Sequence, residues 1–231
     1  MKTIGLLGGM SWQSTAGYYR AINEGIRDRL GGLHSAQIAM VSVDFHEVEK
    51  LQHEGNWGAT AMILASAAKN IEAAGADCLL ICTNTMHKVA DKIEPAITIP
   101  LLHIADATAK ELLASKVNRV GLLGTSFTME QDFYKGRLTD KYGLDVLIPS
   151  AEDRAIVHRV IYQELCLGNI LPSSQKDYLR IIDNLAEQGA QAVILGCTEI
   201  GLLVNQTDTS IQLFDTTKIH AQAAVDFAVK C

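Results

Sequence analysis

The chain has 231 residues, of which 48% are hydrophobic and 20% are charged, a balance typical of a folded protein and not of a disordered one. Its 20 Lys and Arg against 26 Asp and Glu give a formal net charge of -6, which argues against nucleic acid as a partner. No apolar run approaches the roughly 18 residues of a membrane span, so we expect no membrane partner.

The cysteine pattern bears on compartment and metal binding. Five cysteines are present, an odd number, and no CxxC pair occurs among them. This pattern argues against a disulfide framework and against a metal site. The N-terminal MKTIGLLGGMSW is typical of a first strand and turn, not of a signal peptide. We therefore expect a cytoplasmic protein without a bound metal.

Apolar runs alternate with amphipathic stretches along the whole chain. In the first half the pattern predicts strands at 3–8, 36–43, 78–83 and 98–103, separated or followed by helices at 13–30, 57–74, 84–94 and 105–115. In the second half it predicts strands at 119–124, 145–149, 191–196 and 210–214, with helices at 128–141, 152–167, 173–188 and 216–229. Ser11 is expected to cap the first helix, and Thr128 with Gln131 to form a capping box on its counterpart.

The sequence also repeats itself. TIGLLGG at 3–9 matches RVGLLGT at 119–125 with an offset of 121 − 5 = 116, and AGADCLLICTNT at 74–85 matches QGAQAVILGCTE at 188–199 with an offset of 189 − 75 = 114. The matched runs lack period-2 alternation, which favours parallel strands buried on both faces. We therefore predict two pseudosymmetric α/β halves, 1–115 and 116–231, each a small mostly parallel sheet flanked by helices. The last helix could pack back onto the first half.

A glycine-rich turn follows the first strand, in the segment GLLGGMS at 5–11. It lacks both the GxGxxG spacing of dinucleotide-binding folds and the P-loop pattern. Two interpretations stay open. The glycines could admit a ligand carboxylate or phosphate at a helix N-terminus, or they could form a tight turn that binds nothing.

Polar clusters follow two of the predicted strands. Thr83-Asn84-Thr85 comes after CLLIC, and Cys197-Thr198-Glu199 comes after AVILG, so that the repeat aligns Thr83 with Cys197. Ligands of parallel α/β sheets gather at the carboxyl ends of strands. If the halves pack about a pseudo-twofold axis, the two clusters face each other across one cleft, which predicts an active site between the halves.

Cys197 is the strongest single candidate for chemistry. It precedes a predicted helix start, a position expected to lower the pKa of a thiol and so allow it to act as a base or a nucleophile. The alternative is an inert buried cysteine. Cys82 aligns with Gly196 and is predicted to pack in the core. His87 and His103 could orient a hydroxyl or carboxylate, although hydrogen-bonded core histidines are the commoner outcome.

Three motifs in order, GLLGGMSWQST, ICTNTMH and GCTEIGLL, resemble the aspartate/glutamate racemase superfamily, most closely its broad-specificity amino-acid racemase branch. The resemblance covers the whole chain. It implies two α/β halves with the active site between them, a small amino-acid substrate, a homodimer, and catalysis without pyridoxal phosphate, metal or any other cofactor. It also implies two acid/base residues that flank the substrate α-carbon.

The resemblance assigns the candidate residues. The family's usual pair is two cysteines; this chain keeps Cys197 and has Thr83 at the other position. Because a threonine hydroxyl is a far weaker acid than a thiol, we expect the two directions of racemisation to differ in rate, with Thr83 returning a proton through water or His87. The residues expected to bind the substrate α-carboxylate or to touch the substrate are Asn84, Thr85, Thr198, backbone N–H groups near Glu199, and Met10.

The expected substrate preference rests on two positions at which this chain departs from the family pattern. Family members that use acidic substrates carry an Arg near the end of the second strand and a Lys in the corresponding helix of the second half. Here Gln52 stands at the first place, and the stretch VIYQELCLGN at 160–169 contains no Lys. We therefore expect broad or neutral amino-acid use.

Three rival functions stay open. A related enzyme could isomerise maleate or decarboxylate malonates with the same proton-handling layout. A carboxylate-binding or sensor protein could have lost turnover together with the first cysteine. The last rival is a generic α/β domain in which Cys197 is structural.

Overall fold

The computed structural model describes residues 1–230 and divides into two compact units. Residues 1–104 together with 220–230 form the first unit, and residues 105–219 form the second. Each unit is a parallel sheet flanked by helices, which confirms the predicted fold class. We expected the join near residue 115; the division instead places the helix that follows residue 104 in the second unit. No helix within the described residues is long and apolar enough to cross a membrane.

The first unit has a three-stranded sheet in the order β2-β1-β3, built from β1 (Ile4–Gly8), β2 (Ile38–Ser42) and β3 (Cys78–Ile81). Its helices and 3₁₀ turns before the join are α1 (Trp12–Leu30), α2 (Phe45–His53), α3 (Trp57–Ala73), η1 (Thr85–Val89), α4 (Ala90–Ile93) and η2 (Glu94–Ala96). Ser11 caps α1 as predicted, because its hydroxyl accepts a hydrogen bond from the Ser14 N–H at 3.3 Å.

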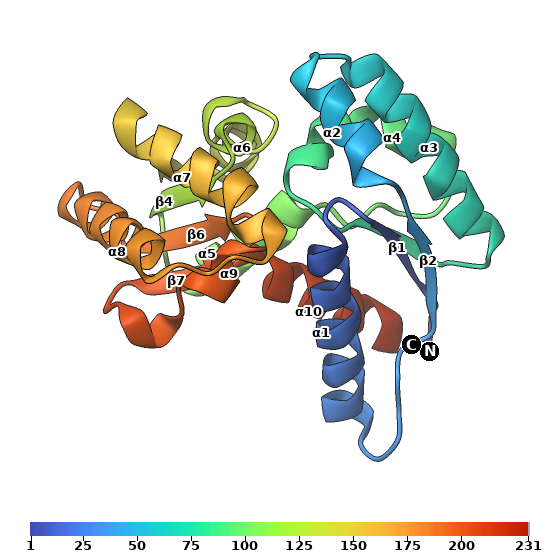
Figure 1. Cartoon of the computed structure of the whole chain (residues 1–231). Helices are drawn as coiled ribbons and strands as arrows, with labels where there is room; N and C mark the ends of the chain where they lie inside the picture. The colour runs from blue at the N-terminus through green and yellow to red at the C-terminus, as the bar shows by residue number, and fades with distance from the viewer. Residues whose placement is uncertain (231) are drawn as a thin grey trace. The chain divides into compact units, whose positions relative to one another are not determined.

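Both faces of this sheet are covered. Leu7 and Ile81 pack with α3 residues such as Leu64 on one face. Leu6 and Leu80 point the other way, into a cluster that holds the buried sides of α1 and of the last helix of the chain. That helix, α10 (Thr216–Val229), therefore packs on the first unit, and its end lies beside the first strand (Figure 1), where the Lys2 N–H donates to the Ala228 carbonyl at 3.0 Å.

The second unit has a four-stranded sheet in the order β5-β4-β6-β7, built from β4 (Arg119–Gly124), β5 (Asp145–Leu147), β6 (Ala192–Gly196) and β7 (Gln212–Asp215). Its other elements are α5 (Ile104–Ala114), α6 (Ser126–Glu130), a π-helical turn η3 (Arg137–Lys141), α7 (Ala151–Gln163), η4 (Leu165–Leu167), α8 (Pro172–Glu187), α9 (Ile200–Leu203) and η5 (Gln206–Asp208). In α8 the buried residues Tyr178, Ile181, Ile182 and Leu185 recur at helical spacing, and the helix packs on β4 and β6.

Strand register preserves the repeat found in the sequence. In the first unit Leu7 pairs with Ile81, and in the second Leu123 pairs with Leu195. The shifts, 123 − 7 = 116 and 195 − 81 = 114, are the two offsets of the sequence repeat. Thr83 and Cys197 each lie two residues beyond these pairs, so they occupy equivalent places at the carboxyl ends of the two sheets.

The predicted strand at 98–103 is wrong except for one residue. Leu101 makes a single parallel bridge to Leu79, with the Leu79 N–H donating to the Pro100 carbonyl at 2.9 Å. The pairing stops there because histidine side chains take the next backbone groups. The Leu102 carbonyl bonds to His220, and the Ile104 N–H bonds to His87.

Two helix predictions also need correction. The predicted helix 128–141 is interrupted between α6 and η3, and η3 is held by Asp106, whose carboxylate accepts from Arg137 at 2.6 Å and from Lys141 at 2.8 Å. The cap of α6 is Thr125, not Thr128. The pattern also missed α2 as a separate helix, although Asp44 caps it by accepting from the His46 N–H at 3.0 Å.

Candidate active site

The glycine-rich turn after β1 is explained by close packing. A Cβ on Gly8 would collide with the Thr15 side chain, and a Cβ on Gly9 would collide with the Val43 carbonyl. Gly9 also has φ +95°, a conformation that favours glycine. Its N–H donates to the Thr15 hydroxyl at 2.8 Å. Both glycines therefore have a structural reason to be present, independent of any ligand, and buried Met10 follows them.

The loop after β3 is held by two side chains from other parts of the first unit. The Ser14 hydroxyl on α1 donates to the Cys82 carbonyl at 2.8 Å. His87 Nδ1 lies 2.8 Å from the Thr83 carbonyl, and His87 Nε2 accepts from the Ile104 N–H at 3.2 Å. Because Nε2 is the acceptor, the ring proton is on Nδ1 and is donated to Thr83. This loop is therefore fixed through its backbone, and the half-buried Thr83 side chain stands at a rigid position.

His87 belongs to a group of three neighbouring histidines. Its ring centroid lies 4.5 Å from that of His103 and 5.8 Å from that of His220. Burial, followed by the proximity of the other two rings, lowers the pKa of His87 well below its usual value. With both ring nitrogens engaged and the ring neutral, His87 positions the Thr83 backbone. The expectation that it relays a proton to the Thr83 hydroxyl gains no support from these contacts.

The remaining candidates of the first unit are buried. Asn84 and Thr85 follow Thr83 into η1, Met10 follows β1, and Gln52 lies on α2. Because β1 and β3 are neighbours in the sheet, Met10 and the residues from Thr83 onward both emerge from its carboxyl edge. The sequence did not single out Ser14, which supports this loop; its place in the motif GGMSWQST was the only signal.

Cys82 behaves as predicted, as a core residue. It is fully buried among apolar residues of α1, β1 and α10, and burial raises the pKa of its thiol. A thiol in that setting stays protonated and has no reason to take part in proton transfer.

In the second unit the three predicted residues form one hydrogen-bonded cluster. The Cys197 thiol donates to Oε2 of Glu199 at 2.9 Å, and the Thr198 hydroxyl donates to the same oxygen at 2.7 Å. Glu199 is buried, with 4% of its surface exposed, whereas Cys197 and Thr198 are half-buried. The sequence pattern pointed only to the Glu199 backbone, so the hydrogen bonds of its carboxylate were not predicted.

The expected lowering of the Cys197 pKa is wrong. The pKa of this thiol is raised well above its usual value, first by burial and then by the negative charge of Glu199, although a hydrogen bond from the Glu199 backbone acts in the opposite direction. The helix that follows, α9, has only four residues, and its dipole does not offset these effects. The resting residue is therefore a protonated thiol.

The stretch 160–169, where the sequence resemblance led us to look for a Lys, contributes a carboxylate. Glu164 is buried. Its carboxylate accepts a hydrogen bond from Arg159 at 3.0 Å and another from the Ser174 hydroxyl. Arg159, the cation that directly precedes this stretch, is thus paired with Glu164 within the protein. This arrangement offers little attraction for a second substrate carboxylate.

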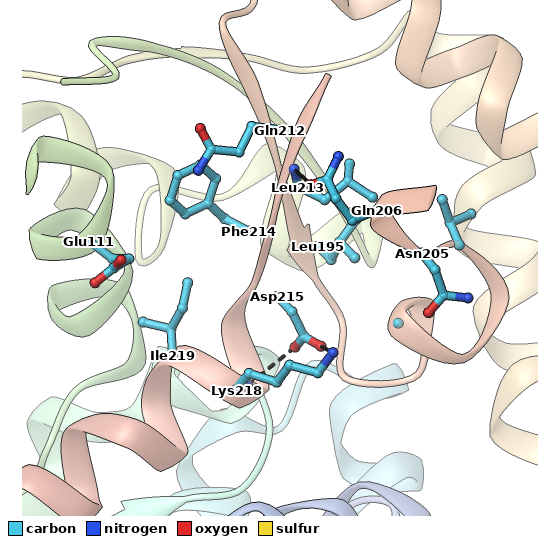
Figure 2. Close-up of a pocket in the computed structure, with 12 residues that line it drawn as sticks. Glu111, Leu195, Asn205, Gln206, Gln212, Leu213, Phe214, Asp215, Lys218 and Ile219 are labelled. Atoms are coloured by element: carbon cyan, nitrogen blue, oxygen red, sulfur yellow. Dashed lines mark hydrogen bonds and ion pairs between the residues drawn. The ribbon is translucent and has the colours of Figure 1, made fainter. Parts of the chain in front are cut away.

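A separate hollow of about 280 Å³ lies in the second unit, where β7, the start of α10 and α5 meet (Figure 2). Figure 2 shows Asp215 and Lys218 pointing toward each other. They form an ion pair, with 3.6 Å between Lys218 Nζ and Asp215 Oδ2. Asp215 also accepts from the Thr217 N–H at 3.0 Å and so caps α10. Its carboxylate is thus committed to structure. Neither Cys197 nor Glu199 lines this hollow, which we do not connect with the candidate site.

Known proteins that resemble this chain identify its family. The family model described as Asp/Glu/hydantoin racemase matches residues 7–224. The chain belongs to this family. Racemases are isomerases, and the finding confirms the superfamily predicted from the three motifs.

Individual relatives agree. The chain is 20% identical to the broad-specificity amino-acid racemase RacX of Bacillus subtilis over 96% of each chain. Among solved structures it matches a Yersinia pestis protein assigned as an Asp/Glu racemase, with 55% identity, a TM-score of 0.93 and full coverage of both chains (100% each). It also matches an aspartate racemase homologue of Pyrococcus horikoshii, with 35% identity, a TM-score of 0.87 and 100% coverage of both chains.

Proposed function

We propose that the protein is a cofactor-independent amino-acid racemase of broad specificity, in which Cys197 and Thr83 exchange the α-proton on opposite faces of the substrate. Inversion at a carbon needs one group to remove a proton and another to deliver one from the other side. A duplicated α/β unit supplies two such groups at equivalent places.

The observation that carries this proposal is the register of the two sheets. Thr83 and Cys197 lie equally far beyond the pairs Leu7–Ile81 and Leu123–Leu195. A polar cluster in each unit follows at once, Asn84 and Thr85 in the first and Thr198 and Glu199 in the second. We assign Asn84, Thr85, Thr198 and Met10 to contacts with the substrate.

The two groups differ in acidity, and a kinetic asymmetry follows. Cys197 is the base for one enantiomer, while Thr83 returns a proton to the other face. Because the Thr83 hydroxyl is almost never ionised near neutral pH, it is a poor base for the reverse direction. The forward and reverse rates should differ, although the equilibrium ratio of free enantiomers cannot change.

Broad specificity is supported by two features. Gln52 stands where acidic-substrate relatives carry an Arg, and the stretch 160–169, which lacks a Lys, holds Glu164, paired with Arg159 just before it. The likeness to RacX points the same way. We also propose, on the resemblance alone, that the protein acts in the cytoplasm as a homodimer.

The test is α-proton exchange. The full chain is incubated with a panel of L-amino acids in D₂O without added cofactor, loss of the α-proton is followed by NMR, and D-enantiomers are measured by chiral chromatography. We expect exchange and D-product for several neutral amino acids. Cys197→Ala should abolish both, whereas Cys166→Ala, which removes the other half-buried thiol of the second unit, should retain them.

The outcomes separate the rival functions. Full exchange in Cys197→Ala would sink the assignment of that thiol. Amino-acid binding without exchange in the wild type would favour a carboxylate-binding protein. Turnover of maleate or a substituted malonate without amino-acid racemisation would favour the related isomerase or decarboxylase.

A further inference from the structure

Two side chains hold the peptide groups on either side of Thr83. The Ser14 hydroxyl on α1 donates to the Cys82 carbonyl at 2.8 Å, and His87 Nδ1 on η1 donates to the Thr83 carbonyl at 2.8 Å. The Cys82 carbonyl belongs to the peptide group before the Thr83 Cα, and the Thr83 carbonyl belongs to the peptide group after it. Because peptide groups are planar, holding both of them sets the two backbone dihedral angles of Thr83.

The direction of the Thr83 hydroxyl follows from these backbone angles. Threonine is β-branched, so few χ1 rotamers are open to it once its backbone is fixed. The two donors are shielded from water, since Ser14 is 5% exposed and His87 is 3% exposed, whereas Thr83 is half-buried. Hydrogen bonds shielded in this way are stronger than bonds in water. Ser14 and His87 therefore determine where the hydroxyl of Thr83 stands.

The His87 ring is itself held from its other side. Its Nε2 accepts from the Ile104 N–H at 3.2 Å, which leaves the ring proton on Nδ1 for the bond to Thr83. His220 holds the same segment, because its Nε2 donates to the Leu102 carbonyl at 2.6 Å. Burial, followed by the nearness of the other two histidine rings, lowers the pKa of His87 well below its usual value. The ring is therefore neutral near pH 7 and keeps this arrangement of donor and acceptor.

We propose that Ser14 and His87 are positioning residues for Thr83, which hold its hydroxyl where it delivers a proton to the substrate α-carbon. This inference rests on the proposed racemase function. The thiolate form of Cys197, produced when the thiol loses its proton to solvent, takes the α-proton. The electron pair of the Cα–H bond stays on carbon.

The resulting carbanion has two fates. Cys197 can return the proton, which restores the starting enantiomer. Thr83 can deliver its hydroxyl proton to the opposite face, which gives the inverted enantiomer, and the alkoxide left on Thr83 then regains a proton from water. Proton transfer needs hydrogen-bond reach, and a displacement of about 1 Å can slow a reaction about 100-fold. A loosened Thr83 therefore favours return of the proton over inversion.

The experiment compares return with inversion in the full-length chain. The starting material is the neutral amino acid that the wild type racemises fastest, as the enantiomer it processes faster, because that is the one that Cys197 deprotonates. In D₂O, NMR follows deuterium that enters the remaining starting enantiomer, and chiral chromatography follows the inverted one. Hydrogen–deuterium exchange with mass spectrometry over residues 82–88 reports how firmly the loop is held.

Matched variants separate the individual hydrogen bonds. In His87→Asn the side-chain amide takes the place of Nδ1 and can still donate to Thr83, whereas in His87→Gln it takes the place of Nε2 and the bond to Thr83 is lost. Ser14→Thr keeps the hydroxyl, and Ser14→Ala removes it. The controls are His34→Gln and Ser66→Ala, at exposed positions of the same unit.

His87→Gln and Ser14→Ala should each lower the kcat for inversion about tenfold or more, with KM little changed, and should raise the ratio of return to inversion. Residues 82–88 should take up deuterium faster in both. His87→Asn and Ser14→Thr should lie nearer to the wild type in every readout. The double variant His87→Gln with Ser14→Ala should lose less than the product of the two single losses, because both act through one hydroxyl. The two controls should change nothing.

Several results would overturn the inference. Equal losses of return and inversion would place the defect before the carbanion, and equal losses in His87→Asn and His87→Gln would show that the bond to Thr83 is not what matters. Wild-type inversion in His87→Gln and in Ser14→Ala would contradict it directly. If neither of these variants folds, a loss of inversion in His87→Asn and Ser14→Thr as large as that in Thr83→Val overturns it.

A failure of the proposed function would look different. In that case the wild type would racemise no amino acid. The deuterium uptake of residues 82–88 would still test the positioning role, because uptake unchanged in His87→Gln and Ser14→Ala would show that these side chains do not hold Thr83.

Discussion

The buried histidines of the first unit should make its stability depend on pH. His220 is fully buried on α10, where its Nε2 donates to the Leu102 carbonyl at 2.6 Å and its Nδ1 accepts from the Tyr18 hydroxyl at 2.8 Å. Burial lowers the pKa of His220 from 6.5 to about 4, against a smaller opposing effect of the bond to Leu102. The folded state therefore favours the neutral ring.

The sign of the effect follows from proton binding. Between pH 6.5 and about 4 the unfolded chain holds a proton on His220 that the folded chain does not, so the free energy of unfolding falls as the pH falls through that window. The full contribution is about 3 kcal/mol, at about 1.4 kcal/mol per pH unit. About 2 kcal/mol of it is lost between pH 7 and pH 5. His87 acts in the same direction, because its pKa is also lowered.

The assay is urea unfolding at pH 7 and pH 5, followed by tryptophan fluorescence. Both tryptophans, Trp12 and Trp57, lie in the first unit, so the signal reports the unit that contains His220. The test variant is Tyr18→Phe combined with His220→Gln. The glutamine amide can still donate to the Leu102 carbonyl, and the phenylalanine removes the hydroxyl that would lose its acceptor. In this variant the pH dependence should shrink by about 2 kcal/mol.

A matched control removes a histidine that is exposed. His34→Gln should leave the difference between the two pH values as it is in the wild type. The reasoning would be refuted if the double variant lost as much stability between pH 7 and pH 5 as the wild type does. It would also fail if His34→Gln removed a comparable part of the dependence.

Two further predictions concern specificity and the turn after β1. Gln52→Arg should raise the ratio of the racemisation rate of aspartate to that of alanine about tenfold, because it adds a cation for a second carboxylate. The control is Gln222→Arg, at an exposed position. If the two variants gave the same ratio, the main support for broad specificity would be lost. Gly9→Ala should lower the free energy of unfolding by at least about 2 kcal/mol, since φ +95° and a collision with the Val43 carbonyl act together. Gly31→Ala, at φ +79° with open space, should cost only about 1 kcal/mol in the same urea titration.

Much of the fold was accessible from the sequence because the sheets are parallel and buried on both faces. Strands such as β1, β3, β4 and β6 are continuous apolar runs, and their repeat offsets reappear in the observed register. The exceptions arise from single side chains. His220 and His87 bond to backbone groups that a longer strand at 98–103 would use for pairing. No periodicity in the sequence predicts that a histidine side chain will take these groups.

The candidate site was predicted by residue type and place, but its electrostatics were not. A cysteine before a helix start suggests a lowered pKa, and this holds only if the helix is long and no anion lies nearby. Here α9 is short, and Glu199 lies two residues after the thiol and turns its carboxylate back toward it. Only the side-chain geometry shows that the carboxylate near Cys197 accepts a hydrogen bond from its thiol.

The equivalent positions of Cys197 and Thr83 therefore have different surroundings, and the difference bears on which residue can accept a proton. At Cys197 the adjoining carboxylate, that of Glu199, accepts a hydrogen bond from the thiol. At Thr83 the adjoining groups are a neutral histidine bonded to its backbone and, at the place equivalent to Glu199, Thr85. A hydroxyl without a nearby carboxylate in its own cluster is suited to hand a proton on, not to abstract one. The residue at position 83 and the residue two places later thus depart from symmetry together, as the proposed abstraction by Cys197 requires.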